Sequence, residues 1–446
     1  MRVAIAGYGA EGQSSYRYFT QHGHDVTIVT NRVSPLYPIP EGAKSIIAED
    51  AFEQLSDFEM VIRTPPMAPI LVKTNGKVWS QTNEFFDKCP APIIGVTGTK
   101  GKGTTCSLVA SVLQKAGKTV HLVGNIGLPP LDVLQKISAD DFVVYELSSF
   151  QLWDAQKSPH VAVVLMIEQD HLDIHASFAE YIDAKANIRR HQTVGDVCIY
   201  HPTNQYSRQI AGVELSDWRE GSEESIDLAS RYGVQDDDQV FVKDGYFCVQ
   251  DRQICTIDNL RLPGMHNLDN ACAAISAAIA AADGVTDEAV ASGLRAFEGL
   301  PHRLKRAAIV DGVSYFDDSI ATTPGSVIAA LRAFTVPKVL IIGGADKGAD
   351  YGELIDEIAN SQSIRAVVVI GSNADQLSGL LQDRVDATAV SNVGMVPMGK
   401  VVATAADYAQ RGDVVILSPA SASFDQYKNY ADRGDQFAQE AERLAS

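Results

Sequence analysis

The stretch 93–106 has the sequence Ile-Ile-Gly-Val-Thr-Gly-Thr-Lys-Gly-Lys-Gly-Thr-Thr-Cys. Its apolar start predicts a buried strand, its glycines predict a tight turn that carries Lys102, and residues 107–116 have apolar positions at helical spacing. Such a unit binds polyphosphate, because backbone N–H groups, the positive end of a helix and an ammonium group converge on the phosphate oxygens. The stretch therefore predicts a phosphate-binding loop between a strand and a helix.

The loop departs from the strict pattern G-x-x-x-x-G-K-[ST] at one position, because Gly103 follows Lys102. A hydroxyl group that reaches a magnesium ion must then come from Thr99, Thr104 or Thr105, and we favour Thr104. The alternative interpretation of the stretch is a glycine-rich turn with a surface lysine. We favour phosphate binding, although the loop alone specifies neither the nucleotide nor the reaction.

The whole chain has the composition of a globular protein that works in water. Its 446 residues suggest two to four domains, and its formal net charge of -19 argues against a nucleic-acid partner. The six cysteines form no C-x-x-C pair, which predicts reduced thiols in a cytoplasmic protein. No stretch approaches ~20 apolar residues, and a strand is predicted from Arg2, so we expect neither a membrane span nor a signal peptide.

The first domain, predicted over residues 1–91, begins with a Rossmann-like pattern. A strand over 2–6 precedes the glycines of G-x-G-x-x-G at 7–12, a helix is expected over about 13–22, and a second strand over 26–29. An NAD site needs an acidic residue after that second strand, but Thr30, Asn31 and Arg32 stand there. The pattern therefore favours a nucleotide diphosphate over NAD, and the domain ends near the stiff segment 90–92.

Two further α/β domains are predicted, over 92–300 and 301–446. In the central domain, apolar runs alternate with helical segments, which is typical of a mainly parallel sheet covered by helices. Its predicted elements are strands at 142–146, 161–166 and 196–200, helices at 177–191 and 267–282, and a β-hairpin at 238–257 with its turn at 243–245. The third domain is predicted to be Rossmann-like, with strands at 307–310, 338–342, 366–370 and 414–417.

Polar side chains follow several strands of the predicted central sheet. Glu146 ends one strand, Asp170, His171 and Asp173 follow the next, and Lys185 comes later on a helix. Parallel strands place their carboxyl ends at one edge of a sheet, where ligands bind. Magnesium prefers oxygen ligands, so Glu146 beside a phosphate loop is a candidate metal ligand. Taken alone, each could also cap a helix or face solvent, and Lys185 alone would be a surface lysine.

The order of these motifs resembles that of the Mur ligase family, ATP-dependent enzymes that build the cell-wall peptide on a UDP-sugar. The resemblance covers essentially the whole chain, and as a set its motifs are highly specific. They are GVTGTKGKGTT (95–105), GNIGLP (124–129), ELSSFQL (146–152), DHLD (170–173), YIDAK (181–185), GMHNLDNA (264–271), GLPHR (299–303), DDSIATTPGS (317–326), GGADKGAD (343–350) and SPASASFDQYKNYADRGDQF (418–437). Three of these motifs, ELSSFQL, GLPHR and the C-terminal motif at 418–437, point to members that add glutamate.

The resemblance implies roles for individual residues. Four would be catalytic, namely Lys102, Glu146, His171 and Lys185. The implied ATP contacts are Gly98, Thr99, Lys100, Gly101, Lys102, Gly103, Thr104, Asn270, Arg303 and Asp318. The implied contacts to the UDP-linked substrate are Gly9, Ala10, Glu11, Asn31, Arg32, Asn125 and His171. The incoming glutamate would contact Thr322, Lys347, Ser423 and Tyr430, the last at a position where the family usually has Phe.

The same resemblance implies the reaction and its cofactors. Glutamate, most simply D-glutamate, would be joined to UDP-N-acetylmuramoyl-L-alanine through an acyl phosphate, a step in peptidoglycan synthesis and hence in cell shape and division. Two Mg²⁺ ions would be held by Thr104, Glu146, His171 and a carbamylated Lys185. The implied partners are ATP and these two substrates, with no nucleic acid and no membrane, and we expect a cytoplasmic monomer.

Two departures from the family pattern keep alternatives open. Members that add D-glutamate typically have a lysine where Ile320 stands, and loss of a cation opposite a carboxylate is not neutral. The segment 318–324 is similar to variants that add L-glutamate. The loop with Gly103 also resembles folylpolyglutamate synthase, which lacks a separate first domain. A dehydrogenase would explain only residues 7–12, and a non-catalytic UDP-sugar-binding protein would require that Gly103 abolishes magnesium binding.

Overall fold

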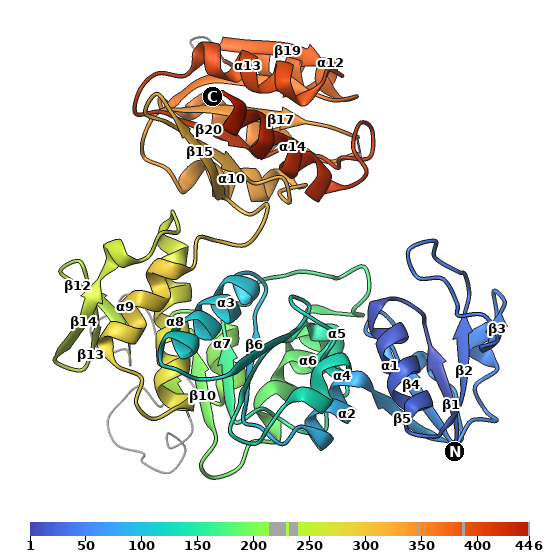
Figure 1. Ribbon diagram of the computed structural model, residues 1–446. Coiled ribbons are helices and arrows are strands. Elements are labelled where there is room, and N and C mark those ends of the chain that lie inside the picture. The colour runs from blue at the N-terminus through green and yellow to red at the C-terminus, as the bar shows by residue number, and fades with distance from the viewer. Residues whose placement is uncertain (214–228, 232–239, 347, 386–388, 445–446) are drawn as a thin grey trace. The chain divides into compact units, whose positions relative to one another are not determined.

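The computed structural model describes residues 1–213, 229–231, 240–346, 348–385 and 389–444. The chain forms two compact units. The first consists of Met1–Leu260 with Leu268–Phe297, and the second of Arg261–Asn267 with Glu298–Ser446. Figure 1 labels the helices and strands of both units.

The first unit begins with a five-stranded parallel sheet in the order β3-β2-β1-β4-β5. Its strands are β1 (Arg2–Ala6), β2 (Asp25–Thr30), β3 (Lys44–Ile47), β4 (Met60–Arg63) and β5 (Lys77–Ser80), and its helices are α1 (Ala10–Gln21) and α2 (Gln81–Lys88). The predicted start of the first helix near residue 13 was wrong, since α1 begins at Ala10. The turn between β1 and α1 is correspondingly short, and Gly7 enters it with a φ of 95°.

The central sheet of the first unit has six parallel strands in the order β11-β10-β9-β6-β8-β7. The strands are β6 (Ile93–Thr97), β7 (Val120–Gly124), β8 (Phe142–Glu146), β9 (Val161–Val164), β10 (Val197–Tyr200) and β11 (Ala229–Arg231). The helices are α3 (Lys102–Lys115), α4 (Pro130–Val133), α5 (Ser149–Leu152), α6 (Phe178–Arg190), α7 (Gln205–Ala211), α8 (Met265–Ala281) and α9 (Asp287–Ala296). The strands and longer helices expected from alternation are confirmed, with shifted ends.

The helix after the glycine loop begins earlier than the sequence pattern suggested. We expected it over 107–116, but α3 starts at Lys102. Glycine has a low helix propensity, which disguised the first turn. Because of this start, Lys102, Gly103 and Thr104 lie on the first turn of a helix whose backbone N–H groups point toward the loop.

The β-hairpin is confirmed over the part that the structure describes. Strands β12 (Phe241–Lys243), β13 (Tyr246–Val249) and β14 (Arg252–Thr256) form a small antiparallel sheet in sequence order. Its first turn contains Asp244 and Gly245, both at positive φ, as a two-residue hairpin turn requires. Residues 238 and 239 of the expected hairpin lie outside the described residues.

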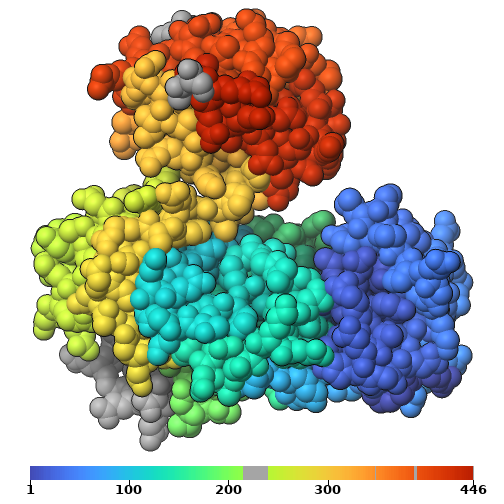
Figure 2. Space-filling view, in the orientation of Figure 1, coloured from blue at the N-terminus to red at the C-terminus, as the bar shows by residue number. Residues whose placement is uncertain are grey.

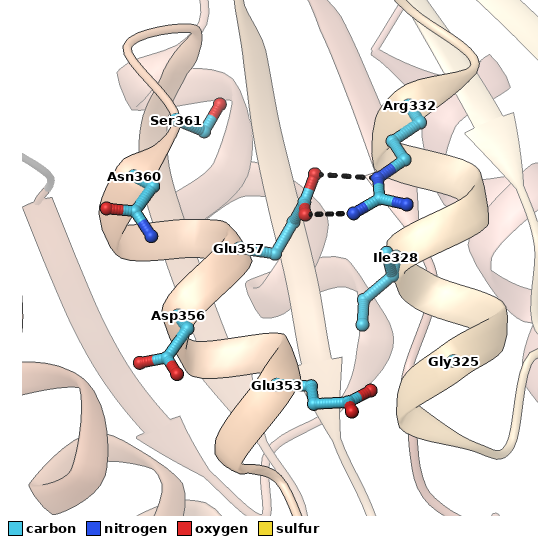
Figure 3. Close-up of a pocket in the computed structure, with 8 residues that line it drawn as sticks. All are labelled: Gly325, Ile328, Arg332, Glu353, Asp356, Glu357, Asn360 and Ser361. Atoms are coloured by element: carbon cyan, nitrogen blue, oxygen red, sulfur yellow. Dashed lines mark hydrogen bonds and ion pairs between the residues drawn. The ribbon is translucent and has the colours of Figure 1, made fainter.

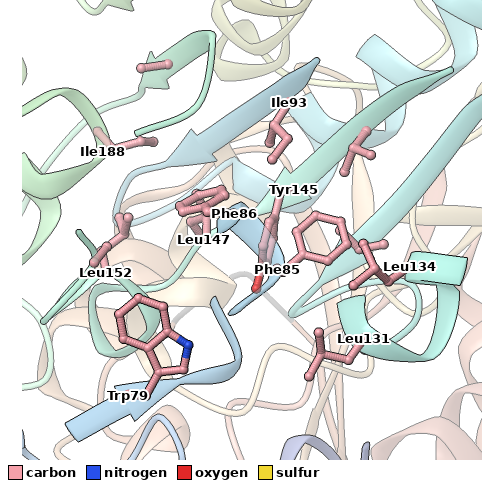
Figure 4. Packing of buried hydrophobic residues seen from close by; sticks show 14 of the residues in the cluster. Trp79, Phe85, Phe86, Ile93, Leu131, Leu134, Tyr145, Leu147, Leu152 and Ile188 are labelled. Atoms are coloured by element: carbon pink, nitrogen blue, oxygen red, sulfur yellow. The ribbon is translucent and has the colours of Figure 1, made fainter. Parts of the chain in front are cut away.

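A single hydrophobic core joins the first and central sheets of the first unit. Phe85 and Phe86 of α2 contact the ring of Tyr145 on β8, with centroids 5.6 and 5.8 Å apart. Figure 4 shows this cluster together with Trp79 of β5. In Figure 2 the blue region that contains the first sheet borders the cyan to green region that contains the central sheet. Shared apolar burial therefore fixes these two sheets against each other.

The second unit holds a six-stranded sheet in the order β15-β16-β20-β17-β18-β19. Only the pair β15–β16 is antiparallel among these described strands. The strands are β15 (Lys305–Val310), β16 (Val313–Asp317), β17 (Lys338–Gly343), β18 (Ile364–Ile370), β19 (Ala389–Gly394) and β20 (Val414–Leu417). The helices are α10 (Pro324–Arg332), α11 (Gly352–Asn360), α12 (Ala374–Gln382), α13 (Met398–Tyr408) and α14 (Tyr430–Arg443).

Helices cover the second sheet through two hydrophobic clusters. One cluster contains α10, α11 and α12 residues, and the other contains α13 and α14 residues. The α/β fold class with mainly parallel sheets is therefore confirmed. Among the described residues, no helix is both long enough and apolar enough to pass through a membrane.

Candidate active site

The glycine loop lies at the carboxyl edge of the central sheet, between β6 and α3. Thr97 ends β6, and the backbone N–H of Thr99 donates to the carbonyl of Met166, which follows β9. Gly101 has a φ of 83°, and a Cβ atom there would lie 2.3 Å from Oδ1 of Asn270. Only glycine fits this position, so the predicted ATP contact Asn270 of α8 packs directly against the loop.

Two lysines meet at one carbonyl oxygen of this loop. Lys102 Nζ donates to Gly98 O at 2.9 Å and to Thr99 O at 2.9 Å. Lys185 Nζ donates to the same Gly98 O at 3.0 Å and to Thr97 Oγ1 at 3.2 Å. The fold thus brings together two residues that are 83 positions apart in the sequence. Both amino groups therefore lie at the loop where polyphosphate was predicted.

Lys185 is one of the most buried side chains of the first unit, with 1% of its surface exposed. Its ammonium group lies 4.6 Å from the ring centroid of Tyr181, and no carboxylate among the described residues forms an ion pair with it. Burial lowers the pKa of Lys185 well below its ordinary value, and the nearby charge of Lys102 acts in the same direction. Considered without the neighbouring motifs, Lys185 would have been taken for a surface lysine, and that interpretation is wrong.

Glu146 ends β8 and is 4% exposed. Its Oε1 atom accepts a hydrogen bond from Asn125 Nδ2 at 3.3 Å, while its Oε2 atom is buried without a hydrogen-bond partner. An unpartnered buried carboxylate oxygen is costly unless a donor or a cation completes it. The pair Glu146 and Asn125, both predicted site residues, therefore fits a bound cation.

The hydroxyl groups of the loop threonines differ in their contacts. Thr99 Oγ1 is within 3.0 Å of Tyr181 Oη and donates to the carbonyl of Glu168. Thr105 Oγ1 donates to Asn270 Oδ1 at 3.4 Å. Thr104, at the first turn of α3, makes no such side-chain hydrogen bond to the described residues. This contrast supports Thr104 as the hydroxyl group that replaces the one missing at Gly103.

His171 lies in the loop after β9 and is more exposed than Glu146 and Lys185. Its φ of 55° places it in the left-handed region, and its Nε2 lies 3.6 Å from Asp170 Oδ2. Its ring centroid is 4.9 Å from that of Phe150. Among the described residues, no three His, Cys, Asp or Glu side chains converge as a ready metal cluster. The predicted ligand set is therefore brought to one sheet edge without forming a closed site.

The residues predicted to hold the UDP-linked substrate lie on the first sheet, apart from Asn125 and His171. Gly9 precedes α1, Ala10 and Glu11 form its first turn, and the exposed Asn31 and Arg32 follow β2. These five residues lie at the carboxyl ends of the adjacent parallel strands β1 and β2. Such a crevice is the usual ligand position in an open α/β sheet.

The carboxylate of Glu11 is directed at the central sheet and not at the predicted position of the UDP-linked substrate. Gln151 Nε2 donates to Glu11 Oε1 at 2.7 Å, which joins α1 to α5 of the central sheet. Burial raises the pKa of Glu11 to about 7, against the opposing effects of Gln151 and of the positive charge of Arg63. Arg63 itself donates to both carboxylate oxygens of Asp154. Glu11 thus contacts the central sheet with its carboxylate, and only its backbone lies at the predicted phosphate position.

In the second unit, the predicted ATP contacts Arg303 and Asp318 behave differently. Arg303 is exposed before β15. Asp318 is 4% exposed, and its two oxygens accept from the backbone N–H of Leu304 at 3.2 Å and from Ser418 Oγ at 2.7 Å. Burial raises the pKa of Asp318 to about 7. Asp318 therefore ties the end of β16 to the end of β20.

Three of the four residues predicted to hold glutamate are described, and Lys347 lies outside the described residues. Thr322 is half-buried in the loop between β16 and α10. Ser423 follows β20 and is 1% exposed, with its hydroxyl lacking a partner among the described residues. Tyr430 begins α14, and 41% of it is exposed. These residues share the carboxyl edge of the second sheet.

The second unit also contains a groove of about 670 Å³ between α10 and α11. Figure 3 shows its acidic wall and the two hydrogen bonds from Arg332 to Glu357, which measure 3.1 and 2.7 Å. None of the predicted site residues lines this groove. Arg332 is paired with Glu357, and Asp356 with Arg384, so this groove is not the predicted glutamate site.

Sequence analysis missed several side chains that contact the predicted site. Thr97 and Tyr181 surround Lys185, and His175 lies beside Ser149. Arg433 is completely buried in the second unit and donates to the carbonyl groups of Ser319, Ser421 and Ala422. Buried polar residues with long-range partners leave no periodic signal in the sequence.

Comparisons with known proteins agree on the family of the chain. Residues 96–278 match the model of the Mur ligase middle domain, and residues 302–421 match that of the Mur ligase, glutamate ligase domain. The UDP-N-acetylmuramoylalanine–D-glutamate ligase of Acetivibrio thermocellus is 34% identical, over 98% of this chain and 95% of that protein. The enzyme of the same name from Symbiobacterium thermophilum is 31% identical, over 100% and 98%.

Solved structures show the same fold at lower sequence identity. The UDP-N-acetylmuramate-alanine ligase of Thermotoga maritima superposes with a TM-score of 0.60 at 17% identity, and covers 99% of each chain. At this identity, the similarity concerns the fold alone.

Proposed function

The chain belongs to the Mur ligase family, and on that basis we propose that it joins D-glutamate to UDP-N-acetylmuramoyl-L-alanine with ATP. This reaction extends the peptide of a peptidoglycan precursor. The observation that carries the proposal is the convergence of Lys102 and Lys185 on Gly98 O, beside the unpartnered Oε2 atom of Glu146. We further propose that the chain acts as a monomer in the cytoplasm.

Each group of residues has a task in the proposed reaction. The N–H groups at the start of α3 and the ammonium group of Lys102 would bind ATP phosphates, and Asn270 fixes the shape of the loop. The substrate carboxylate attacks the γ-phosphorus, the bond to ADP breaks, and an acyl phosphate forms. The glutamate amine then attacks the acyl carbon, and phosphate and a proton leave. Because all three reactants are anionic, positioning and charge neutralisation supply most of the catalysis.

Magnesium fits the residues at the sheet edge. We propose that Thr104, Glu146, His171 and a carbamylated Lys185 hold two ions, and the buried, unpartnered Glu146 Oε2 supports this set. Bound Mg²⁺ would neutralise phosphate charge. Carbamylation forms a bond between Lys185 Nζ and the carbon of CO₂ with release of a proton, and it requires a neutral amine. The burial of Lys185 without a carboxylate partner favours that neutral amine.

The proposed substrate contacts lie at two further sheet edges. We place the UDP-linked substrate at Gly9, Ala10, Asn31 and Arg32, with Asn125 and His171 nearer the reacting end. Thr322, Ser423, Tyr430 and Lys347 would hold glutamate, and the unpartnered hydroxyl of Ser423 supports this site. The domain ranges 1–91, 92–300 and 301–446 correspond to these three binding tasks.

The decisive assay is phosphate release from ATP with UDP-N-acetylmuramoyl-L-alanine and either D- or L-glutamate, with a folate substrate as control. We expect turnover with D-glutamate only. Turnover with L-glutamate alone would contradict the stereochemical assignment, and Ile320 would be the first residue to examine. No turnover with either glutamate, or turnover with the folate alone, would contradict the proposed substrate. Light scattering of the purified chain measures its molar mass, which should be that of a monomer.

A further inference from the structure

A buried histidine, His175, lies behind the candidate active site and connects three of its parts. It is 2% exposed, and it follows the loop that carries His171. Its ring lies against Phe150 and Trp153 of the segment after β8, with centroids 5.2 and 4.2 Å away. The ring also makes an edge contact with Tyr181 of α6, at 5.4 Å. The side chain thus touches the segments that supply Glu146, His171 and Lys185.

The polar contact of His175 is directed at the turn after Glu146. Its Nε2 atom is 2.9 Å from Oγ of Ser149, which is itself 2% exposed. Ser149 begins α5, whose N-terminus is fixed by a capping box between Ser148 and Gln151. Because Ser149 is three residues after Glu146, this hydrogen bond restrains the turn that sets the direction of the Glu146 side chain.

Two other hydrogen bonds hold the same turn from the opposite side. The N–H of Leu147 donates to Val96 O at 2.9 Å, and Thr97 Oγ1 donates to Leu147 O at 2.9 Å. Thr97 is also the partner of Lys185. The turn after β8 is therefore held by β6 on one side and by His175 on the other.

His175 also holds the loop of His171 in its left-handed conformation. The N–H of His175 donates to His171 O at 3.0 Å, and the N–H of Ile174 donates to the same oxygen at 3.1 Å. A residue other than glycine at a φ of 55° needs such support from its surroundings. The burial of the His175 ring among three aromatic side chains anchors this support.

We propose that His175, through Ser149, is a positioning residue that holds Glu146 and His171 in the geometry for Mg²⁺ and nucleotide. The inference rests on the proposed function for the identity of that ligand. Ser149 is not a nucleophile in this arrangement, because it is almost fully buried and Glu180 lies 3.9 Å from the other ring nitrogen, beyond hydrogen-bond distance. The pair acts on the site only through the backbone and side chains that it orients.

The test uses the full chain with His175→Phe, His175→Gln, Ser149→Ala and the double variant His175→Phe/Ser149→Ala. Phenylalanine keeps a ring but loses the nitrogen atoms, and glutamine keeps an amide donor near the position of Nε2. The control is His191→Phe, since His191 Nε2 likewise makes one internal hydrogen bond, at 3.0 Å to Ala155 O, at the end of α6. Calorimetry with ADP at limiting and saturating Mg²⁺ measures binding, and phosphate release measures the Mg²⁺ concentration for half-maximal activity.

We expect His175→Phe and Ser149→Ala each to raise the required Mg²⁺ concentration about 10-fold, as loss of a hydrogen bond behind a metal ligand does. The KM for glutamate and the affinity for ADP without Mg²⁺ should stay unchanged. The double variant should resemble the single variants, His175→Gln should recover most of the loss, and His191→Phe should resemble the parent. A general loss of folded protein would lower kcat without moving the Mg²⁺ requirement.

An unchanged Mg²⁺ requirement in both single variants, additive effects in the double variant, or an equal effect of His191→Phe would overturn the inference. If His175→Phe does not fold, the Mg²⁺ requirement of Ser149→Ala decides between the outcomes, because that variant removes only one oxygen atom. A parent chain that binds Mg²⁺ with ADP but adds no glutamate would contradict the proposed function alone, because the binding measurements still test His175. A parent chain that binds neither would overturn both.

Discussion

A buried cation in each of the two units, Lys185 in the first and Arg433 in the second, has no carboxylate ion pair among the described residues. The two cations differ in the number of hydrogen bonds that they donate. Lys185 in the first unit makes two hydrogen bonds and faces the ring of Tyr181. Arg433 in the second unit makes four, to Ser319 Oγ and to the carbonyl groups of Ser319, Ser421 and Ala422.

The difference indicates two uses of a buried cation. Burial lowers the pKa of Lys185 well below its ordinary value, whereas it lowers the pKa of Arg433 only to about 10, so the arginine stays charged at neutral pH. A lysine that loses its proton becomes a reactive amine, and a guanidinium group surrounded by carbonyl oxygens becomes a permanent brace. Lys185 is thus suited to chemistry, and Arg433 to holding the ends of β16 and β20 and the start of α14.

The largest expected effect is that of Lys185→Ala on activity. We expect a loss of phosphate release of about 10³-fold or more, because a ligand and a charge next to the phosphates are removed. Added short carboxylates should restore part of the activity if Lys185 acts as a carbamate. A variant that retains a tenth of the parent activity would contradict a catalytic role.

Arg433→Met should instead act on stability. The four acceptor groups of Arg433 lose their donor, and each unsatisfied buried acceptor costs on the order of 1 kcal/mol or more, so we expect a loss of about 3 kcal/mol in the second unit. Denaturant unfolding followed by a probe in each unit measures it. Arg332→Met, which removes a surface ion pair with Glu357, is the control and should cost less than about 1 kcal/mol. An equal loss of unfolding free energy in Arg433→Met and Arg332→Met would contradict a stabilising role for Arg433.

The pH dependence of the unfolding free energy extends the comparison to a partly buried acid, Glu11. The pKa of Glu11 in the folded protein is about 7, above its ordinary value of 4.5. Its contribution to the free energy of unfolding is therefore fully present below pH 4.5 and is lost as the pH rises through 7. Glu11→Gln should therefore be more stable than the parent at pH 8, by about 1–2 kcal/mol, and equal to it near pH 4.5. Arg63 and Tyr145 are the other titratable groups that act on this carboxyl group.

Chemical denaturation of the parent and of Glu11→Gln at five pH values between 4.5 and 8 measures this effect. Glu53→Gln, at the exposed end of the short helical turn Ala51–Glu53, is the matched control and should show no pH-dependent difference. If the unfolding free energies of Glu11→Gln and of the parent changed in parallel with pH, the pKa of Glu11 would not be raised by folding, and the prediction would be wrong.

The smallest stability effect is expected for Ser423→Ala, because the hydroxyl group has no partner to lose. The change in unfolding free energy should stay within about 0.5 kcal/mol. Ser418→Ala, the matched variant, removes the bond to Asp318 and should cost about 1–3 kcal/mol. If Ser423 holds glutamate, its variant should raise the KM for glutamate while the KM for ATP stays constant. An unchanged KM for glutamate would remove Ser423 from that site.

Much of the fold followed from local sequence patterns. Strands at 2–6, 93–97 and 142–146 and the long helices were predictable because burial of one face imposes a period on apolar residues. The early start of α3 was not predictable, because Gly103 in its first turn has a low helix propensity. The positions of Glu146 at the end of one strand and of His171 in the loop after the next were also predictable, since parallel strands place their carboxyl ends together.

The partners of the site residues depended on the tertiary structure. Glu11 and Gln151 are 140 residues apart, and Ser149 and His175 are 26 apart, so no local pattern connects them. Whether Lys185 lies on the surface or in the interior was equally beyond sequence pattern, since α6 is amphipathic and one lysine on it can face either way. Burial, and with it the loss of charge, is a property of the packed neighbours.

By itself, the sequence determined the motifs, the alternation of strands and helices, and the glycines that the phosphate loop requires. Only the tertiary structure decided that Lys102 and Lys185 share Gly98 O, that Glu146 Oε2 is left without a partner, and that His175 lies behind them. The physical reason is the distance along the sequence over which each interaction acts. Backbone propensity acts over a few residues, whereas desolvation and hydrogen-bond satisfaction depend on segments that meet only when the sheets pack.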